Sequence, residues 1–306
     1  MISYYYKKSK EEDFSTIDAP MHGCWINVEE AVSTDLYKVC EITGLEFSSI
    51  QDALDRYEIP RVEKLNNCII LYTRHPIEVE AGLYTMSLTI IITHHYFITI
   101  SPSSNVFVKN FLTKKGKMPD SHSLKVLIQL LLRITQEFNL QVRRVRHNVL
   151  TQQKDMIHVE SDDISDLTRH EEILNQYHSS LVPLRGVLEH LLTGKFIALH
   201  EKDSEHIDDV LNAIRQSEDL CSIVNKTIRG LRDSYQIIFT NNLNKTIKLL
   251  TALTIIFSIP TMIASLYGMN VALPYAEFKH MFGLLFSLIV AFSVVCFYFF
   301  RKRGWL

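Results

Sequence analysis

Apolar residues follow different periods in different parts of the chain, and these periods divide it into regions. Before residue 102 they are mostly β-branched or aromatic and occur in short runs, which is typical of strands. The predicted strands include residues 25–28, 68–72 and 87–100, and the last run predicts a hairpin that turns near His94 and His95. A short helix with a serine cap is predicted for residues 48–54. We therefore expect an α/β domain over residues 1–120.

From residue 121 the apolar residues recur at intervals of three and four, which predicts amphipathic helices. Cytoplasmic helices are expected within residues 121–202, one of them over residues 162–192 with a kink at Pro183. A stalk helix is expected over residues 203–248. Its apolar seam recurs every seven residues, at Ile207, Ile214, Cys221, Ile228 and Tyr235. A heptad seam needs a partner, and we expect this one to hold neighbouring subunits together.

Charge is distributed unevenly, although the formal net charge of the whole chain is only −2. Residues 249–276 and 281–300 contain no Asp, Glu, Lys or Arg. Each segment can cross a bilayer, which takes about 20 apolar residues. We predict transmembrane helices at 249–269 and 281–300, an outer loop at 270–280 and a basic tail at 301–306. The fold class is then an α+β membrane protein with an α/β cytoplasmic domain and a long helical stalk that continues into the first of two carboxyl-terminal transmembrane helices. The continuous helix, stalk and span together, would be about 90 Å long.

Basic residues flank the two predicted spans and indicate their orientation. Lys245 and Lys248 precede the first span, and the tail after the second begins Arg301-Lys302-Arg303. Positive residues favour the cytoplasmic side, and the first residues of the chain are too polar for a signal peptide. We expect both termini in the cytoplasm, the loop outside, and the protein in the inner (plasma) membrane.

Several other kinds of chemistry find little support in the sequence. The five cysteines form no C-x-x-C pair, and no phosphate loop or nucleophile-base arrangement is found, so we expect neither an enzyme nor a nucleic-acid partner. His94 and His95 are expected on a strand, with side chains on opposite faces that cannot share a metal. Residues 155–172 carry seven acidic residues and one basic residue, Arg169. This segment is either a solvated helix face or a means of concentrating cations near a pore mouth.

A stripe of small and polar residues follows one face of the first predicted span. Its members are Thr251, Thr254, Ser258, Thr261, Ser265 and Gly268, at alternating intervals of three and four, and seven residues before it lies Asn244. Such residues also let membrane helices pack closely, with hydroxyls bonded to their own helix. A stripe along the whole span favours a water-filled channel, because polar groups in lipid need partners. Several copies would be needed to enclose it, and uncharged oxygens suit Mg²⁺, which gives up its water reluctantly.

The end of this span carries the sequence Tyr267-Gly268-Met269-Asn270, followed by a short loop and the second span. Together with residues 49–54, 60–63 and 183–188, this sequence resembles the CorA-type magnesium and divalent metal ion transporters. The resemblance implies a homopentamer whose selectivity filter is Gly268, Met269 and Asn270. The remaining implied or predicted pore residues are Asn244, Thr254, Ser258, Thr261 and Ser265 along the pore, Ile247 and Leu250 at an apolar constriction, and Asp233 at the inner mouth.

The resemblance also implies regulation by intracellular Mg²⁺ bound between subunits, at Asp52 and Asp209. We therefore predict channel-type transport of hydrated Mg²⁺ into the cytoplasm, with Mg²⁺ as both cargo and regulator and with no other cofactor. The expected partners are copies of the same chain, the lipid bilayer and divalent cations. Two alternatives stay open: a Zn²⁺, Co²⁺ or Ni²⁺ transporter of the same fold, and a membrane-anchored coiled-coil scaffold. The sequence leaves proton coupling open as well.

Overall fold

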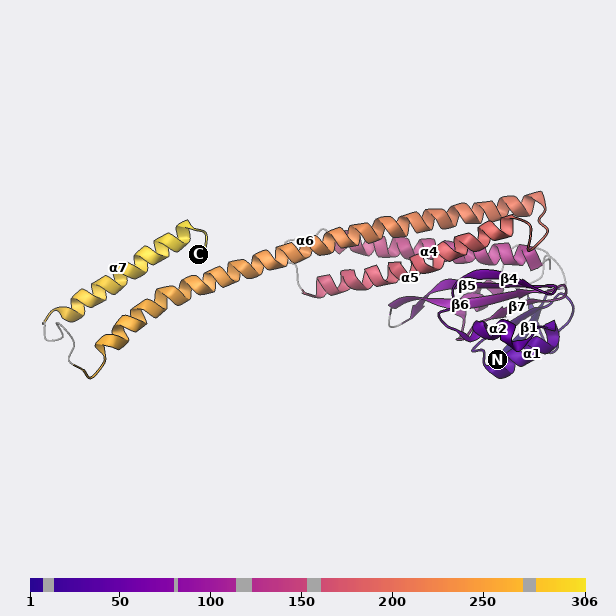
Figure 1. Ribbon diagram of the computed structural model, residues 1–306, viewed down its shortest axis with the longest axis horizontal. Coiled ribbons are helices and arrows are strands. Elements are labelled where there is room, and N and C mark those ends of the chain that lie inside the picture. The colour runs from indigo at the N-terminus through magenta and orange to yellow at the C-terminus, as the bar shows by residue number, and fades with distance from the viewer. Residues whose placement is uncertain (8–13, 80–81, 114–122, 153–160, 272–278) are drawn as a thin grey trace. The chain divides into compact units, whose positions relative to one another are not determined.

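The computed structural model describes residues 1–7, 14–79, 82–113, 123–152, 161–271 and 279–306. Figure 1 shows the elements in chain order, with strands and short helices first and long helices after them. Internal contacts divide the chain into two units. The first comprises residues 1–155 and 165–231, and the second comprises residues 156–164 and 232–306.

The first unit contains a seven-stranded sheet with the order β2-β1-β3-β7-β6-β5-β4. The strands are β1 (Ile2–Tyr6), β2 (Ser15–Ile17), β3 (Trp25–Val28), β4 (Arg61–Leu65), β5 (Cys68–Val79), β6 (Gly82–Ile92) and β7 (Phe97–Ile100). Only the β3–β7 pair is parallel. The predicted hairpin is confirmed as β6 and β7. The placement of His94 and His95 on a strand was wrong, because they occupy the turn between these strands, where their ring centroids lie 4.9 Å apart.

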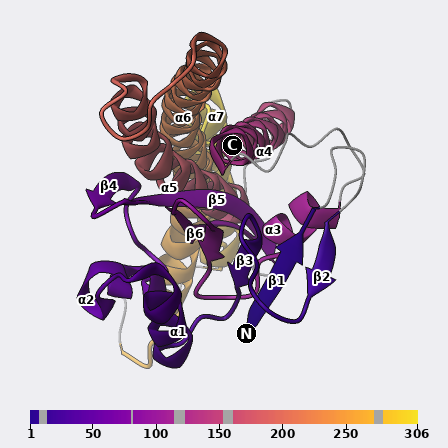
Figure 2. The same ribbon diagram turned by 90° about the vertical axis from the view of Figure 1, so that its right-hand side faces the viewer.

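Short helices cover one face of this sheet (Figure 2). They are α1 (Ser33–Thr43), α2 (Phe47–Ile50) and the 3-10 helix η1 (Gln51–Leu54). Leu36 and Val39 of α1 pack with Ile50 against the strands in one buried apolar cluster. The predicted serine cap was wrong, because α2 starts one residue before Ser48 and has no side-chain cap bond. The serines lie inside the helix turn instead.

The first unit also contains three long helices: α4 (Ser123–Gln152), α5 (Ser161–Leu192) from residue 165 onward, and α6 (Glu201–Tyr267) up to residue 231. The short helix α3 (Val106–Thr113) precedes them. Helices α4, α5 and the first part of α6 lie side by side in Figures 1 and 2. Ion pairs join α5 to α6, with 2.8 Å between Glu171 and Arg229 and 3.1 Å between Glu189 and Arg215. Phe138 of α4 contacts Tyr177 of α5 edge to face.

The heptad seam of α6 is buried within this one chain. Ile207, Ile214, Cys221 and Ile228 are at most 2 % exposed. The expectation that the seam holds neighbouring subunits together was therefore wrong. Helices α4 and α5 of the same chain supply the apolar surface that a heptad pattern requires, and the pattern alone cannot tell an intramolecular partner from an intermolecular one.

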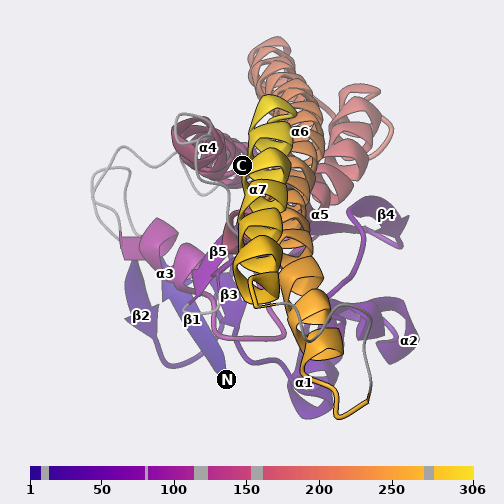
Figure 3. The ribbon, with the colours of Figure 1, turned by 90° about the vertical axis from the view of Figure 1, so that its left-hand side faces the viewer.

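The second unit contains the first residues of α5, the rest of α6 and the helix α7 (Met281–Lys302). Both helices include a segment that is long and apolar enough to cross a bilayer. As predicted, α6 runs without interruption from the stalk into the first of these segments, and Pro260 lies inside the helix. Helix α7 returns beside the carboxyl-terminal part of α6 (Figures 1 and 3).

Candidate functional site

One face of α6 carries all the residues that the sequence suggests for the interior of a pore. At 3.6 residues per turn they fall within roughly a third of the helix circumference. They are Asp233, Asn244, Ile247, Leu250, Thr254, Ser258, Thr261 and Ser265, and each of them is exposed. The polar stripe thus remains a single continuous face along the part of α6 that belongs to the second unit.

The opposite face of α6 is the one that is partly covered. Ala252 is fully buried, and Ile255, Ile256, Ile259 and Ile263 are half-buried. Helix α7 has a matching stripe at helical spacing among its less exposed residues, formed by Met281, Leu285, Ile289, Phe292, Cys296 and Phe300. Helix α7 is beside this part of α6 (Figure 3), and the covered residues of α6 lie on the apolar face, so we infer from their burial that the hydroxyl face is the one away from α7. The hydroxyls therefore do not serve the packing of α6 on α7 within the chain.

The threonine hydroxyls on this face have their protons engaged by the helix itself. Thr254 Oγ1 donates to the Leu250 carbonyl oxygen at 2.8 Å, and Thr261 Oγ1 donates to the Phe257 carbonyl oxygen at the same distance. A hydroxyl that donates in this way still has an oxygen that can accept. Such oxygens suit the water shell of a hydrated cation, because that shell presents O–H donors outward.

The polar face ends at a tight helix terminus. The Gly268 amide donates to the carbonyl oxygens of Ala264 at 3.0 Å and of Ser265 at 3.2 Å. A Cβ atom on Gly268 would lie 3.3 Å from the Ala264 oxygen, so the glycine permits this close approach. Met269 and Asn270 follow as exposed residues just beyond the helix. The proposed filter residues are thus adjacent at the end of the stripe, and most of the predicted outer loop lies outside the described residues.

Asp52, the first predicted regulatory residue, lies on η1 and is paired with Arg61 of β4. Asp52 Oδ2 is 2.7 Å from Arg61, and the Asp52 side chain is 48 % exposed. Arg61 also binds Glu63 at 2.6 Å and Glu58, and it stacks on the Tyr72 ring. Burial disfavours the charged guanidinium, but the hydrogen bond to Glu63 and the negative charges of Glu58 and Glu63 outweigh it and raise the pKa of Arg61. Arg61 therefore stays charged.

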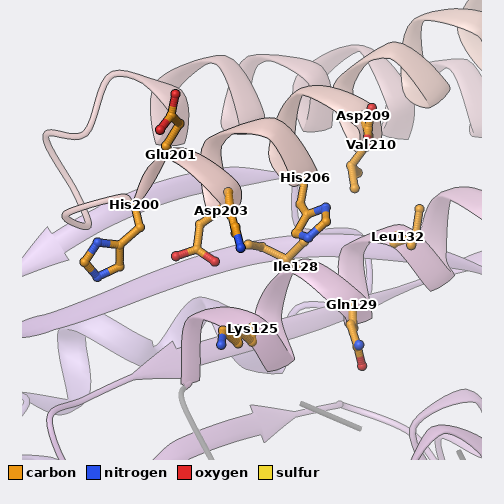
Figure 4. A pocket seen from close by; sticks show the side chains of 11 residues that line it. Lys125, Ile128, Gln129, Leu132, His200, Glu201, Asp203, His206, Asp209 and Val210 are labelled. Carbon is orange, nitrogen blue, oxygen red and sulfur yellow. The ribbon is translucent and has the colours of Figure 1, made fainter. Parts of the chain in front are cut away.

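Asp209, the second predicted regulatory residue, lies on α6 in the wall of a cleft of about 640 Å³ between α4 and α6 (Figure 4). Leu132 and Gln129 lie on the α4 side. Asp52 lies on η1 and Asp209 on α6, and in the described part of the chain no hydrogen bond or ion pair joins them. Among the described residues, no three His, Cys, Asp or Glu side chains form a metal-binding group. The two aspartates could serve one metal only if they came from different copies of the chain.

The predicted acidic segment is only partly described, because its first six residues, 155–160, lie outside the described residues. The remainder belongs to α5, where Asp162 and Asp166 are exposed. Glu171 instead forms the ion pair with Arg229, and its side chain is 13 % exposed. Glu171 therefore helps to hold α5 and α6 together. Asp162 and Asp166 are the exposed acids to which the predicted attraction of cations would apply.

The fold and the polar face define a class of protein. It is a membrane protein with two spans, a large α/β unit before them, and one polar face on the first span. Residues 21–302 match the family described as "CorA-like Mg2+ transporter protein", and the chain belongs to this family. That family consists of transporters and not of enzymes.

Individual relatives cover nearly the whole chain. The "Cobalt/magnesium transport protein CorA" of Methanocaldococcus jannaschii is 26 % identical over 92 % of this chain and 91 % of its own length. The protein of the same name from Thermotoga maritima is 21 % identical over 92 % of this chain and 83 % of its own. The complete structure of the CorA magnesium transporter from Methanocaldococcus jannaschii superposes with a TM-score of 0.78 at 23 % identity, over 100 % of this chain and 99 % of that one.

Arg61 is the residue at this site whose role the sequence did not suggest. It lies in the segment 60–63 that carries part of the family resemblance, and a signal was present in the Arg-x-Glu spacing. Residues two apart on a strand share a face, so Arg61 and Glu63 were placed to pair. The approach of Asp52 depends on the fold and could not be read from spacing.

Proposed function

We propose that several copies of this chain form a channel for hydrated Mg²⁺, with the polar face of α6 inside and α7 outside. The observation that carries the proposal is the opposition of the two faces of α6. The hydroxyl face is exposed in the single chain, and the apolar face is the one beside α7. A hydroxyl whose proton is bound by its own helix still has an oxygen that can accept, and a shared aqueous pore supplies water as the donor to all of these oxygens.

Each group of residues has a distinct part in this proposal. Asn270 and the Gly268 carbonyl select the hydrated ion at the outer end, beside Met269. The hydroxyls of Thr254, Ser258, Thr261 and Ser265 and the amide of Asn244 accept hydrogen bonds from its water shell. Ile247 and Leu250 narrow the pore with apolar side chains that resist passage of water when closed. Asp233 attracts the cation at the inner mouth.

The family relationship supports the finer points of the proposal. The relatives are described as cobalt/magnesium transport proteins, and this supports divalent cargo with Mg²⁺ first. A homopentamer, a location in the inner membrane, cytoplasmic termini and movement into the cytoplasm are part of the proposal. They rest on the charge flanking the spans and on the family resemblance.

Regulation by the cargo completes the proposal. Mg²⁺ bound between Asp52 of one subunit and Asp209 of its neighbour would relieve the repulsion between the two carboxylates and stabilise a closed state. Loss of that ion would let the subunits move and open the pore. Asp209 is exposed and the Asp52 side chain is 48 % exposed, and the two residues lie on different elements, which supports a site between subunits.

The test is flux into proteoliposomes that contain the purified full chain and a magnesium-sensitive dye. We expect Mg²⁺ influx from the wild type and its loss in Asn270→Ala. Asn212→Ala, an exposed residue on the same helix outside the spans, is the control and should leave flux unchanged. Influx of Zn²⁺ without Mg²⁺ would favour the zinc alternative. Absence of any flux, with Asn270→Ala indistinguishable from the wild type, would favour the scaffold.

A further inference from the structure

The Asp52 carboxylate already has a cationic partner within its own chain. Arg61 Nη2 donates to Asp52 Oδ2 at 2.7 Å, and Arg61 Nε donates to Glu63 Oε1 at 2.6 Å. The third guanidinium nitrogen, Nη1, donates to Glu58. Each nitrogen of one arginine thus binds a different carboxylate. A metal ion that approaches Asp52 meets a carboxylate whose charge is partly neutralised.

The three carboxylates do not depend equally on this arginine. Glu58 and Glu63 are the two acids whose charges act most strongly on Arg61. The Asp52 side chain is 48 % exposed, whereas that of Glu58 is 15 % exposed. Arg61 also keeps its position through the Tyr72 ring, 4.0 Å below the guanidinium. Asp52 can therefore leave Arg61 while the guanidinium keeps its other partners.

The charges around Arg61 make such an exchange favourable for a divalent ion. Three carboxylates surround one guanidinium, which leaves two negative charges in excess at this surface. Two positive charges of an incoming ion match that excess, and Asp52 is the most exposed of the three acids, with Glu63 at 37 % and Glu58 at 15 %.

We propose that Arg61 competes with the divalent cation for Asp52 and thereby sets the cation concentration at which the Asp52 site fills. This inference rests on the proposed role of Asp52 as a regulatory ligand. With little Mg²⁺, Arg61 neutralises Asp52. As Mg²⁺ rises, the ion replaces Arg61 on Asp52, and Arg61 stays bound to Glu58 and Glu63.

Removal of the Arg61 charge should therefore tighten binding of the ion. A unit charge about 5 Å from a divalent ion changes its affinity by about fivefold to tenfold when water and physiological salt screen the interaction. Arg61→Gln shortens the side chain and removes the charge, and Arg61→Met removes the charge in an unbranched chain. Both should lower the half-saturating Mg²⁺ concentration by this factor. Arg61→Lys keeps the charge and should stay within about twofold of the wild type.

A matched control is available in the segment between η1 and β4. Arg56 is exposed and lies five residues before Arg61, so Arg56→Gln removes the same charge without touching Asp52. A second control repeats Arg61→Gln in an Asp52→Asn background. If Arg61 acts through Asp52, the double variant should respond to Mg²⁺ in the same way as Asp52→Asn alone.

The measurement is the midpoint of thermal unfolding of the purified full chain in detergent, titrated with MgCl₂. Ligand that binds the folded state raises this midpoint, and the titration gives the half-saturating concentration. The second measurement is Mg²⁺ flux into proteoliposomes at different internal Mg²⁺ concentrations. The internal concentration that halves the flux should be lower in Arg61→Gln than in the wild type by the same factor.

The inference is overturned if Arg61→Gln behaves as Arg56→Gln does, or if its shift persists in the Asp52→Asn background. A shift of the same size in Arg61→Lys would also overturn it, because packing and not charge would then be responsible. Failure of the proposed transport has a different signature. In that case the wild type carries no Mg²⁺ flux, while the thermal titration still decides whether Arg61 competes for Asp52.

Discussion

The buried histidine of β5 makes the stability of the first unit depend on pH. His75 is fully buried, and its ring stacks on Phe107, with 4.8 Å between centroids. Its Nδ1 lies 3.2 Å from the Pro76 carbonyl oxygen, and its Nε2 lies 3.0 Å from the Asn105 amide nitrogen. Asn105 can only donate there, so Nε2 accepts and Nδ1 carries the proton. The neutral ring satisfies both contacts, and a second proton on Nε2 would break one of them.

Burial lowers the pKa of His75 to about 4, assisted by the charge of Arg74 and opposed by the bond to Pro76. In the unfolded chain the pKa is 6.5. Between these values the unfolded state binds more protons, so stability is full above pH 6.5 and is lost as the pH falls toward 4. The complete loss corresponds to about 3 kcal/mol, at about 1.4 kcal/mol for each tenfold change in proton affinity. Between pH 7 and pH 5 the loss is about 2 kcal/mol.

The assay is thermal unfolding of the full chain in detergent, followed by the fluorescence of the buried Trp25 on the same sheet. The wild type is compared with His75→Gln, which cannot take up a proton. We expect the wild type to lose about 2 kcal/mol more than the variant between pH 7 and pH 5, even if the variant is less stable at pH 7. Other acids titrate equally in both proteins, so the difference isolates His75. Parallel pH profiles would refute the reasoning.

Two further outcomes are expected. Thr261→Val preserves the shape of the side chain and removes a hydroxyl from the polar face, so Mg²⁺ flux in proteoliposomes should fall several-fold. The control Ile256→Val, on the opposite face, should change the flux little. Equal effects of the two substitutions would count against the assigned pore face. Ile214→Ala in the buried seam should lower the free energy of unfolding by about 3 kcal/mol. Ile223→Ala on the exposed side of α6 should change it by less than about 0.5 kcal/mol. Thermal unfolding measures both changes, and equal losses would contradict the burial of the seam.

Strongly patterned elements could be predicted from the sequence, and weakly patterned ones could not. The β6–β7 hairpin is rich in β-branched and aromatic residues, which are densest in Thr89–Ile92 and Phe97–Ile100, so it was evident. Strand β4 has the sequence Arg-Val-Glu-Lys-Leu, and it lies at the edge of the sheet, where charged residues are tolerated. It was missed for that reason. Helix α1 was missed because few of its residues are buried, and its apolar stripe is correspondingly short.

Of the candidate site, the residues that share one helix face could be predicted from the sequence, and the contacts between different elements could not. Spacing alone put Thr254, Ser258 and Thr261 on one helix face, because in a continuous helix the number of residues between two positions fixes the angle between their side chains. Spacing could not reveal which side α7 covers, because the connection between the two helices does not fix their rotation. Nor could it reveal the pairing of Asp52 with Arg61, which brings η1 and β4 together through the fold.

The burial of the α6 seam within one chain determines how the protein responds to dilution. A coiled coil between chains folds only as it associates, so its unfolding midpoint rises with protein concentration. Ile207 through Ile228 already have their apolar neighbours in the same polypeptide. Their burial is therefore a first-order event, independent of how many other copies are nearby. A newly made chain can complete this part of its structure before it meets a second one, and assembly then joins folded bodies.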